Sequence, residues 1–328
     1  MARHIRIMRF GGLGNRMFQY MFALALKARV PDAEISGVEL PEWGISTPAA
    51  PAQTGARVRV VKHDVPFAKV ARRLSSADTI DVDLYRLNLR FEYYRDQLEL
   101  FRRTFPRREI EGAGRDEIAI SIRGGEILTG QHQNFLPLPI SLYERIVDST
   151  GLRPVFAGQI GDDPYSSALR ARFPNARFVK HQSGLADFHF LRASHNIVVA
   201  ISSYSWLASW LSESAERIHL PVAGLYHPAA RPDCNLLPRS DNRYVFHQTD
   251  LLSWSGRREE RSRLSAAPLS DFGYRAGIGS RAWLAMQAGP KRYLQSLARR
   301  HLLFLQGAAD APPADLAQRR AAKEADHV

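Results

Sequence analysis

The sequence predicts an α/β protein made of two doubly wound halves, each built on a parallel sheet. Over residues 117–224, short apolar runs alternate with amphipathic segments through short connections, the pattern of a parallel sheet with helices on both faces. The first half opens on an apolar strand that passes through a glycine-rich turn directly into an apolar helix. At 328 residues, the chain is long enough for two domains of ordinary size.

The first half contains three predicted strand–helix pairs, placed by the spacing of their apolar residues. Strands are expected at 4–10, 57–62 and 79–84, and helices at 15–29, 66–76 and 91–105. Residues 47–52, rich in Pro and Ala, predict a loop, and the charged, Gly-containing residues 106–116 predict a linker to the second half.

The second half alternates more regularly. Strands are expected at 117–123, 154–158, 176–180, 197–203 and 217–224, and helices at 140–151, 163–173, 184–196 and 204–214. Ligands of such sheets bind beyond the carboxyl ends of the strands. The loops after Ile122, Gly158, Lys180 and Ile201 are therefore the candidate binding loops.

The chain becomes basic toward its C-terminus. The formal net charge is +12, and residues 253–306 hold ten Lys/Arg against three Asp/Glu. Because residues 291–305 fit a basic amphipathic helix, we expect 280–306 to contact an anionic membrane surface, with a solvated basic face as the alternative. The predicted domains are 1–110, 111–252, a basic helical segment over 253–306 and a disordered tail over 307–328.

The composition indicates in which compartment the protein works and which partners are not expected. The single cysteine, Cys234, excludes an internal disulfide and suits a reducing compartment. The sequence has no run of eighteen apolar residues and no signal-peptide pattern, so we expect a cytoplasmic protein, peripheral on the inner face of the plasma membrane if 280–306 binds lipid. No zinc-knuckle, basic-zipper or ribonucleoprotein motif accompanies the positive charge, so no nucleic-acid partner is expected.

The opening segment GGLGNRMFQYMFALALK (11–27) indicates an anion site. Gly12, Gly14 and the neighbouring Asn15 stand where a helix begins, and the N–H groups and dipole of that helix favour a phosphate. The pattern is neither a dinucleotide fingerprint nor a P-loop. A tight strand-to-helix turn without a ligand is the alternative.

Three further loops carry residues suited to a nucleotide. Arg123 follows a strand and is succeeded by two glycines and Glu126, an arrangement that suits a diphosphate. Ser202, Ser203 and Ser205 stand at the start of a helix and form a second anion site, and the loop containing Gln159 could read a base or ribose hydroxyls. An exposed arginine in a glycine turn and ordinary helix capping are the alternatives.

Two longer motifs resemble a known family. GGLGNRMFQYMFA is similar to the opening of bacterial α-1,2-fucosyltransferases, glycosyltransferase family 11, and DFHFLRASHNIVVAISSYSWLASWL (187–211) resembles their second signature. The resemblance implies a GT-B-like fold, in which two Rossmann-like domains face a central cleft, a GDP-sugar donor, no metal or other cofactor, and inversion at the anomeric carbon. It also implies that Asn15 and the glycines lie near the donor diphosphate, that Arg123 binds its β-phosphate, and that Ser203 and Ser205 meet the phosphates.

The chain departs from that family at the Arg123 loop. The histidine and second arginine of His-x-Arg-Arg-Gly-Asp are absent from Ser121-Ile122-Arg123-Gly124-Gly125-Glu126, and Leu207 replaces a tryptophan of the second signature. Fucose from GDP-fucose is the first expectation for the donor, and another nucleotide-linked sugar is the alternative. Glu126 and His132 are the candidates for a base that takes the acceptor proton, with a structural role as the alternative for each.

The sequence therefore predicts an inverting, metal-independent glycosyltransferase of surface polysaccharide biosynthesis, acting on an oligosaccharide or lipid-linked glycan. Three alternative functions remain. The triplet Asp81-Val82-Asp83 would suit a metal-dependent sugar transferase. The basic C-terminal region would suit a non-catalytic polyanion-binding protein, and the altered Arg123 loop would suit an inactive member of the family.

Overall fold

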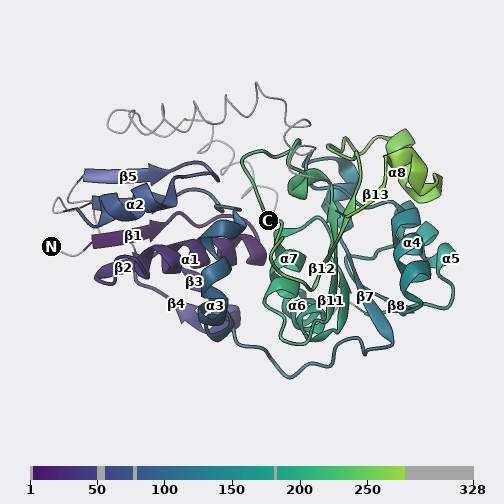
Figure 1. Cartoon of the computed structure of the whole chain (residues 1–328), viewed down its shortest axis with the longest axis horizontal. Helices are drawn as coiled ribbons and strands as arrows, with labels where there is room; N and C mark the ends of the chain where they lie inside the picture. Colours follow the sequence, from purple (N-terminus) through teal and green to yellow (C-terminus); the bar gives the residue numbers. More distant parts are fainter. Residues whose placement is uncertain (1–2, 50–55, 77–79, 181–182, 278–328) are drawn as a thin grey trace, which may run out of the picture.

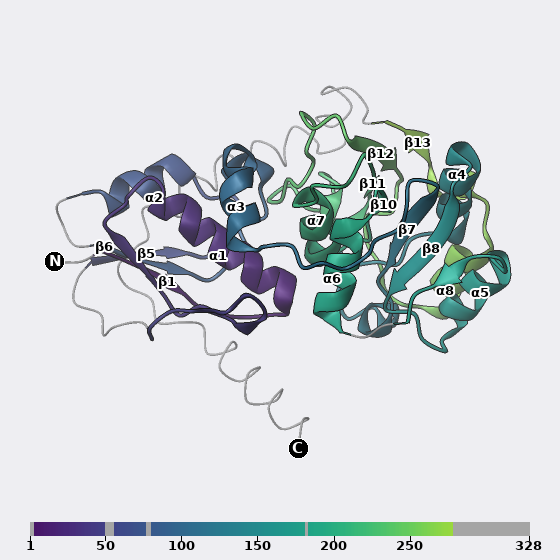
Figure 2. The same cartoon turned by 90° about the horizontal axis from the view of Figure 1, so that it is seen from below.

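A computed structural model describes residues 3–49, 56–76, 80–180 and 183–277 of the chain. These residues form two α/β units, each with its own parallel sheet, connected by a stretch without helix or strand over 106–114 (Figures 1 and 2). The predicted fold class of two Rossmann-like units is confirmed. The predicted segments 280–306, 291–305 and 307–328 lie outside the described residues.

The first unit is a four-stranded sheet in the order β2-β1-β6-β5, with every neighbouring pair parallel. Its strands are β1 (Arg3–Ile7), β2 (Ala33–Ser36), β5 (Ala56–Val60) and β6 (Ile80–Leu84), and its helices are α1 (Leu13–Lys27), α2 (Phe67–Leu74) and α3 (Leu98–Thr104). A short antiparallel pair, β3 (Glu39–Leu40) and β4 (Ile45–Ser46), follows β2. Apolar and polar residues alternate along β1, and Ile5 and Ile7 join the core with Phe18 and Phe22 of α1.

The second unit carries a seven-stranded sheet in the order β13-β12-β11-β10-β7-β8-β9. The strands are β7 (Glu117–Ile122), β8 (Arg153–Gly158), β9 (Arg177–Phe178), β10 (Asn196–Val198), β11 (Arg217–Val222), β12 (Tyr244–Gln248) and β13 (Arg275–Ala276). All described pairs are parallel except β12–β13. The sheet of this unit thus extends past residue 252, because β13 pairs with β12 at its edge.

Helices cover both faces of this second sheet. They are α4 (Ile140–Thr150), α5 (Pro164–Arg172), α6 (Gly184–Ala193), α7 (Ser203–Trp210) and α8 (Arg258–Ala266). Helices α6 and α7 lie on the face toward the first unit, and α4, α5 and α8 lie on the other (Figures 1 and 2). Burial on both faces explains why the central strands read as continuous apolar runs.

The prediction of one helix over 91–105 is wrong. The segment forms two 3₁₀ turns, Phe91–Tyr93 and Arg95–Gln97, before α3 begins. The Tyr94 hydroxyl donates to the carbonyl of Asn88 at 2.7 Å, and the Tyr93 hydroxyl donates to that of Val65 at 2.5 Å. These tertiary hydrogen bonds hold the two phenols in positions that a regular helix does not provide, so they override the helical spacing.

The two units meet mainly along helices α1 and α7. Phe18 of α1 packs on Trp206 of α7, with ring centroids 5.6 Å apart, and Phe91 packs on Trp210 at 5.8 Å. Helix α1 starts beyond the carboxyl end of β1, and α7 starts beyond that of β10. The carboxyl edges of the two sheets therefore face each other, as the GT-B-like prediction requires.

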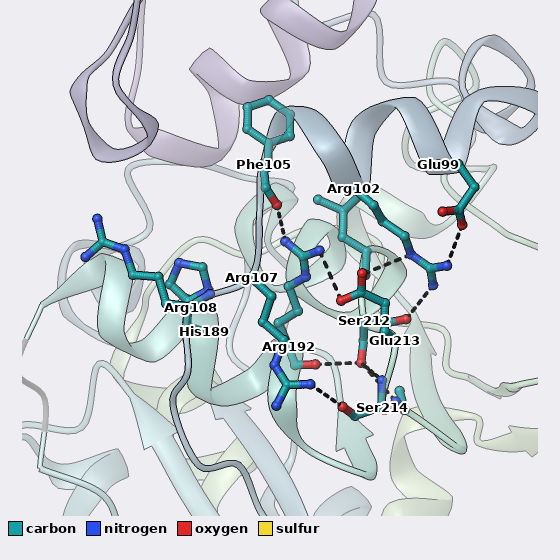
Figure 3. Close-up of polar contacts among 12 residues, drawn as sticks. Glu99, Arg102, Phe105, Arg107, Arg108, His189, Arg192, Ser212, Glu213 and Ser214 are labelled. Atoms are coloured by element: carbon teal, nitrogen blue, oxygen red, sulfur yellow. Dashed lines mark hydrogen bonds and ion pairs between the residues drawn. The ribbon is translucent and has the colours of Figure 1, made fainter.

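Arginines fasten the connection between the units (Figure 3). Arg192, fully buried at the end of α6, donates to the carbonyl of Phe105 and pairs with Glu213 at 3.3 Å. Arg102 of α3 donates to the carbonyls of Leu211 and Ser212 just after α7, at 3.3 and 2.7 Å. These guanidinium groups satisfy carbonyls at helix C-termini, where the helix dipole also favours positive charge.

Among the described residues, no helix combines the length and apolar character needed to cross a membrane.

Candidate functional site

The strand order of the second unit identifies where a ligand would bind. From β7 the chain adds β8 and then β9 on one side, and it then crosses to the other side of β7 to add β10, β11 and β12. The order of the strands therefore reverses between β7 and β10. In doubly wound sheets, the crevice at this switch point, beyond the carboxyl ends of the strands, is the usual ligand site. Arg123 directly follows β7, and Ser202 caps the helix that follows β10, so the structure brings both predicted residues to the switch point.

Arg123 is held in place by its neighbours. Its Nη1 donates to Ser202 Oγ at 3.3 Å, and its Nη2 donates to Glu126 Oε1 at 2.6 Å. The guanidinium lies over the ring of Phe135, 5.8 Å from the centroid, and the side chain is 29% exposed. The cation is thus positioned before any ligand arrives, and part of it faces solvent.

Glu126 is the counter-charge of Arg123. Burial alone would raise the pKa of this carboxyl, but a hydrogen bond at its own backbone and the charge of Arg123 outweigh that effect and leave the pKa below its ordinary value. Gln159 donates from Nε2 to Glu126 Oε2 at 3.4 Å. Glu126 is therefore ionised at neutral pH, the form that accepts a proton, and it connects Arg123 to the predicted Gln159.

Glycines bring the two loops at the switch point into contact. A Cβ on Gly124 would lie 2.4 Å from the carbonyl oxygen of Gln159, and one on Gly158, whose φ is +112°, would lie 2.5 Å from that of Ile122. Only residues without a side chain fit these two positions. Gln159 is consequently fixed beside the Arg123 loop by the backbone, while its side chain is exposed.

The glycine-rich turn of the first unit abuts the start of α7. A Cβ on Gly14 would lie 2.8 Å from both the backbone nitrogen and the Cα of Tyr204, whereas one on Gly12 would meet nothing within 4 Å. Ser203 Oγ donates to Asn15 Oδ1 at 3.0 Å across this contact. Gly14 thus admits the neighbouring helix, and the predicted closeness of Gly12, Gly14 and Asn15 to a donor diphosphate stays a prediction.

Two helix N-termini therefore converge on one place, and each is electrostatically positive. Neither α1 nor α7 has an acidic residue in its first turn, and α1 has no side-chain cap. Together with the Arg123 guanidinium, the two helix ends form an arrangement that stabilises a bound anion.

The serines of α7 divide into two roles. Ser202 accepts the backbone N–H of Tyr204 at 3.3 Å and caps the helix. Ser205 is 1% exposed and donates to the carbonyl of Ala200 at 3.1 Å, so in this structure its hydroxyl holds the turn after β10. The predicted contacts of Ser203 and Ser205 with phosphates stay predictions.

His132 is exposed, and it is connected to Arg123 only indirectly, through Phe135. Its ring centroid lies 6.0 Å from that of Phe135, the same ring that lies beneath the guanidinium. Its predicted role as a base stays a prediction. In the alternative metal triplet Asp81-Val82-Asp83, the Asp83 side chain is buried on β6 and forms an ion pair with Arg6 at 2.7 Å.

The sequence did not point to several residues that support the site. Tyr226 donates to the carbonyl of Ser202 at 2.6 Å and accepts its N–H at 3.1 Å, which fixes the turn between β10 and α7. Gln19, wholly buried in α1, donates to the carbonyl of Met8 at 2.9 Å and steadies the glycine-rich turn. Phe135 supports Arg123. No local pattern signals these contacts, since each depends on residues distant in the chain.

Comparisons with known proteins give architectural likeness only. No protein-family model matches the chain, and no curated protein matches its sequence. Among solved structures, E. coli heptosyltransferase WaaC with ADP is similar over 82% of this chain and 97% of its own, at 12% identity and a TM-score of 0.41. The NodZ α-1,6-fucosyltransferase soaked with GDP-fucose is similar over 66% of this chain and 94% of its own, at 12% identity and a TM-score of 0.37.

Proposed function

We propose that the protein is a glycosyltransferase that binds a nucleotide-sugar donor at the switch point of its second sheet. The observation that carries the proposal is the convergence of Arg123 with the N-termini of α7 and α1 at facing sheet edges. A nucleoside diphosphate is the ligand whose charge and size suit a fixed guanidinium and two uncompensated helix ends.

The same groups would serve the reaction. As the bond between the sugar and the diphosphate breaks, negative charge grows on the leaving phosphate oxygen. Arg123 is already fixed by Ser202 and Glu126, so it stabilises this charge without reorganising. In this proposal the fixed cation takes the place of a metal ion, and the acceptor attacks the anomeric carbon on the side opposite the leaving diphosphate, which inverts that carbon.

For the acceptor proton, Glu126 is the better placed of the two candidate bases. It is ionised and contacts Arg123, whereas His132 reaches the site through Phe135. L-Fucose from GDP-fucose remains our first donor, and a different nucleotide sugar on the same site is the second. The acceptor we propose is a glycan of surface polysaccharide, free or lipid-linked, met at the inner face of the plasma membrane.

Thermal unfolding with GDP, UDP, TDP, CMP and ADP, each with and without EDTA, tests the proposal. A nucleotide at 100 times its dissociation constant adds about 2.7 kcal/mol to the free energy of unfolding. Stabilisation by GDP alone, independent of EDTA, supports a GDP-sugar donor; stabilisation by UDP or TDP keeps the transferase and replaces the donor. If no nucleotide shifts the transition, the inactive-protein and polyanion-binding alternatives become the better accounts.

Sugar transfer is then measured with a nucleotide sugar that contains the nucleotide found to stabilise the chain. Arg123→Ala should abolish release of the nucleotide from its sugar while leaving the unfolding transition cooperative, because the side chain is partly exposed. Near-normal turnover in this variant would show that another group stabilises the leaving diphosphate.

A further inference from the structure

A second cluster of reactive side chains lies in loops other than those of the donor site. His63 follows β5 of the first unit, and Asp233 and Cys234 lie in the loop between η5 (Gly224–Tyr226) and β12 of the second. One ligand-type atom from each of the three lies within 4.8 Å of the other two. The residues are far apart in the sequence, so tertiary structure alone unites an imidazole, a carboxylate and a thiol.

Backbone contacts hold these two loops together. The Phe91 N–H donates to the carbonyl of Asn235 at 2.6 Å, and the Asn235 N–H donates to that of Leu89 at 2.8 Å. Asn88, whose φ of +52° turns the chain, donates from Nδ2 to the carbonyl of Lys62 at 2.9 Å. The positions on either side of the cluster are thereby fixed across the boundary between the units.

His63 is in the state in which a histidine binds metal. Burial, with the nearby charge of Arg231, lowers its pKa to about 4, so the ring is neutral at pH 7. Its Nδ1 is buried and has no hydrogen-bond partner. A buried ring nitrogen without a partner costs free energy that coordination would recover.

Asp233 is held as an oriented carboxylate. Arg231 donates to both of its oxygens, from Nε at 2.9 Å and from Nη2 at 2.8 Å. Burial raises the pKa of Asp233, but Arg231 outweighs it and keeps the pKa below its ordinary value. A carboxylate has about four lone-pair directions, so the bidentate arginine leaves others for a metal and acts as the outer partner that ligating carboxylates commonly have.

Cys234 supplies a soft ligand that a metal would have to deprotonate. It is 6% exposed, and burial raises the pKa of its thiol, so it is protonated at neutral pH. A dication that binds there displaces that proton, and the thiolate together with Asp233 then balances its two charges. One sulfur, one nitrogen and one carboxylate oxygen form a set that suits zinc and its spectroscopic substitute cobalt.

We propose that His63, Asp233 and Cys234 form a site for a zinc-type dication that links the two units. Ligand bonds of about 2.0–2.3 Å in a tetrahedral site suit ligand atoms that lie within 4.8 Å of one another. The fourth position is left to water. The ion lies in loops other than those of the donor site, and the proposal does not depend on the proposed function.

Cobalt binding to the EDTA-treated full chain provides the test. One Co²⁺ per chain should bind, with thiolate-to-cobalt charge-transfer absorption in the near ultraviolet and the visible bands of a tetrahedral ion. Zinc should displace the cobalt and raise the unfolding temperature.

Variants separate this site from adventitious binding. Cys234→Ser should remove the charge-transfer band, and His63→Gln should weaken Co²⁺ binding by roughly tenfold or more, by analogy with losses seen even for outer partners. His195→Gln, at a partly exposed histidine paired with Glu216, is the matched control and should bind like the unaltered chain. Absence of saturable binding, or binding unchanged in both site variants, would overturn the proposal; circular dichroism verifies that each variant is folded.

Discussion

Gly14→Ala measures how closely the two units must approach. The added methyl carbon would lie 2.8 Å from Tyr204 N and Cα, closer than Cβ atoms come in proteins, and at a tight 3.1 Å from Ser203 Oγ. Because the first two are backbone atoms of α7, they cannot rotate away. Overpacking of this kind costs about 1–3 kcal/mol.

Alanine is also the better helix former, which offsets part of that cost by at most about 1 kcal/mol. We therefore expect a net loss of about 1–2 kcal/mol in the free energy of unfolding, measured by urea denaturation. The nucleotide that stabilises the unaltered chain should also bind more weakly, because α1 and α7 are pushed apart at the donor site.

Gly184→Ala is the matched control for this experiment. Gly184 also stands in the first turn of a helix, but a Cβ there would meet nothing within 4 Å. It should leave stability unchanged or raise it by up to about 1 kcal/mol. Equal stability and equal nucleotide affinity for the two variants would refute the claim that Gly14 is required for the contact between the units.

Three further changes have defined outcomes. Tyr226→Phe removes the two hydrogen bonds between the Tyr226 hydroxyl and the Ser202 backbone, but the Ser202 N–H keeps the carbonyl of Ala200 as an acceptor at 2.7 Å; the change should therefore cost only about 0.5–1.5 kcal/mol by urea denaturation, with weaker nucleotide binding. Glu126→Gln removes the counter-charge of Arg123, so nucleotide titration should show tighter diphosphate binding while sugar transfer falls; an unchanged transfer rate would remove Glu126 as the base. Burial lowers the pKa of His247 to about 4 from an unfolded value of about 6.5, so this group costs no stability above pH 6.5 and lowers the free energy of unfolding as the pH falls toward 4, by about 1.4 kcal/mol at pH 5.5. The urea midpoint should therefore fall less steeply with decreasing pH in His247→Phe, while His219, whose pKa burial also lowers, keeps part of the dependence.

The alternation of the second half made its sheet predictable. Five of its strands follow short apolar runs bounded by turn residues, and four of them agree with the structure to within two residues. The run at 197–203 is the exception, because β10 ends at Val198. β12 and β13 escaped prediction because β12 carries His247 and Gln248 and β13 has two exposed residues, so neither shows an apolar run. In the first half, the phenol hydrogen bonds of Tyr93 and Tyr94 overrode a helical pattern that was present in the sequence.

The candidate site was predictable where a residue type and a strand end coincided. Arg123 and Ser202 follow β7 and β10, which are neighbours at the centre of the sheet. Because ligands of doubly wound sheets bind beyond the carboxyl ends of the strands, the sequence alone predicts that both residues belong to one site. That position 14 requires glycine because of Tyr204 was not predictable, since the close approach of Tyr204 depends on how the two units pack together. The same holds for Phe135 and Tyr226, which act through contacts that no spacing in the sequence reveals.

The most direct test of the central claim is calorimetric titration of GDP and guanosine into the unaltered chain and into Arg123→Ala. The account predicts that the unaltered chain prefers the diphosphate over the nucleoside by a large factor, and that this preference collapses in the variant. The unaltered chain's preference should persist in EDTA, since the guanidinium and two helix ends supply the positive charge. Equal affinity of the unaltered chain for both ligands, or an undiminished preference in the variant, would contradict the claim that this switch point binds a donor diphosphate.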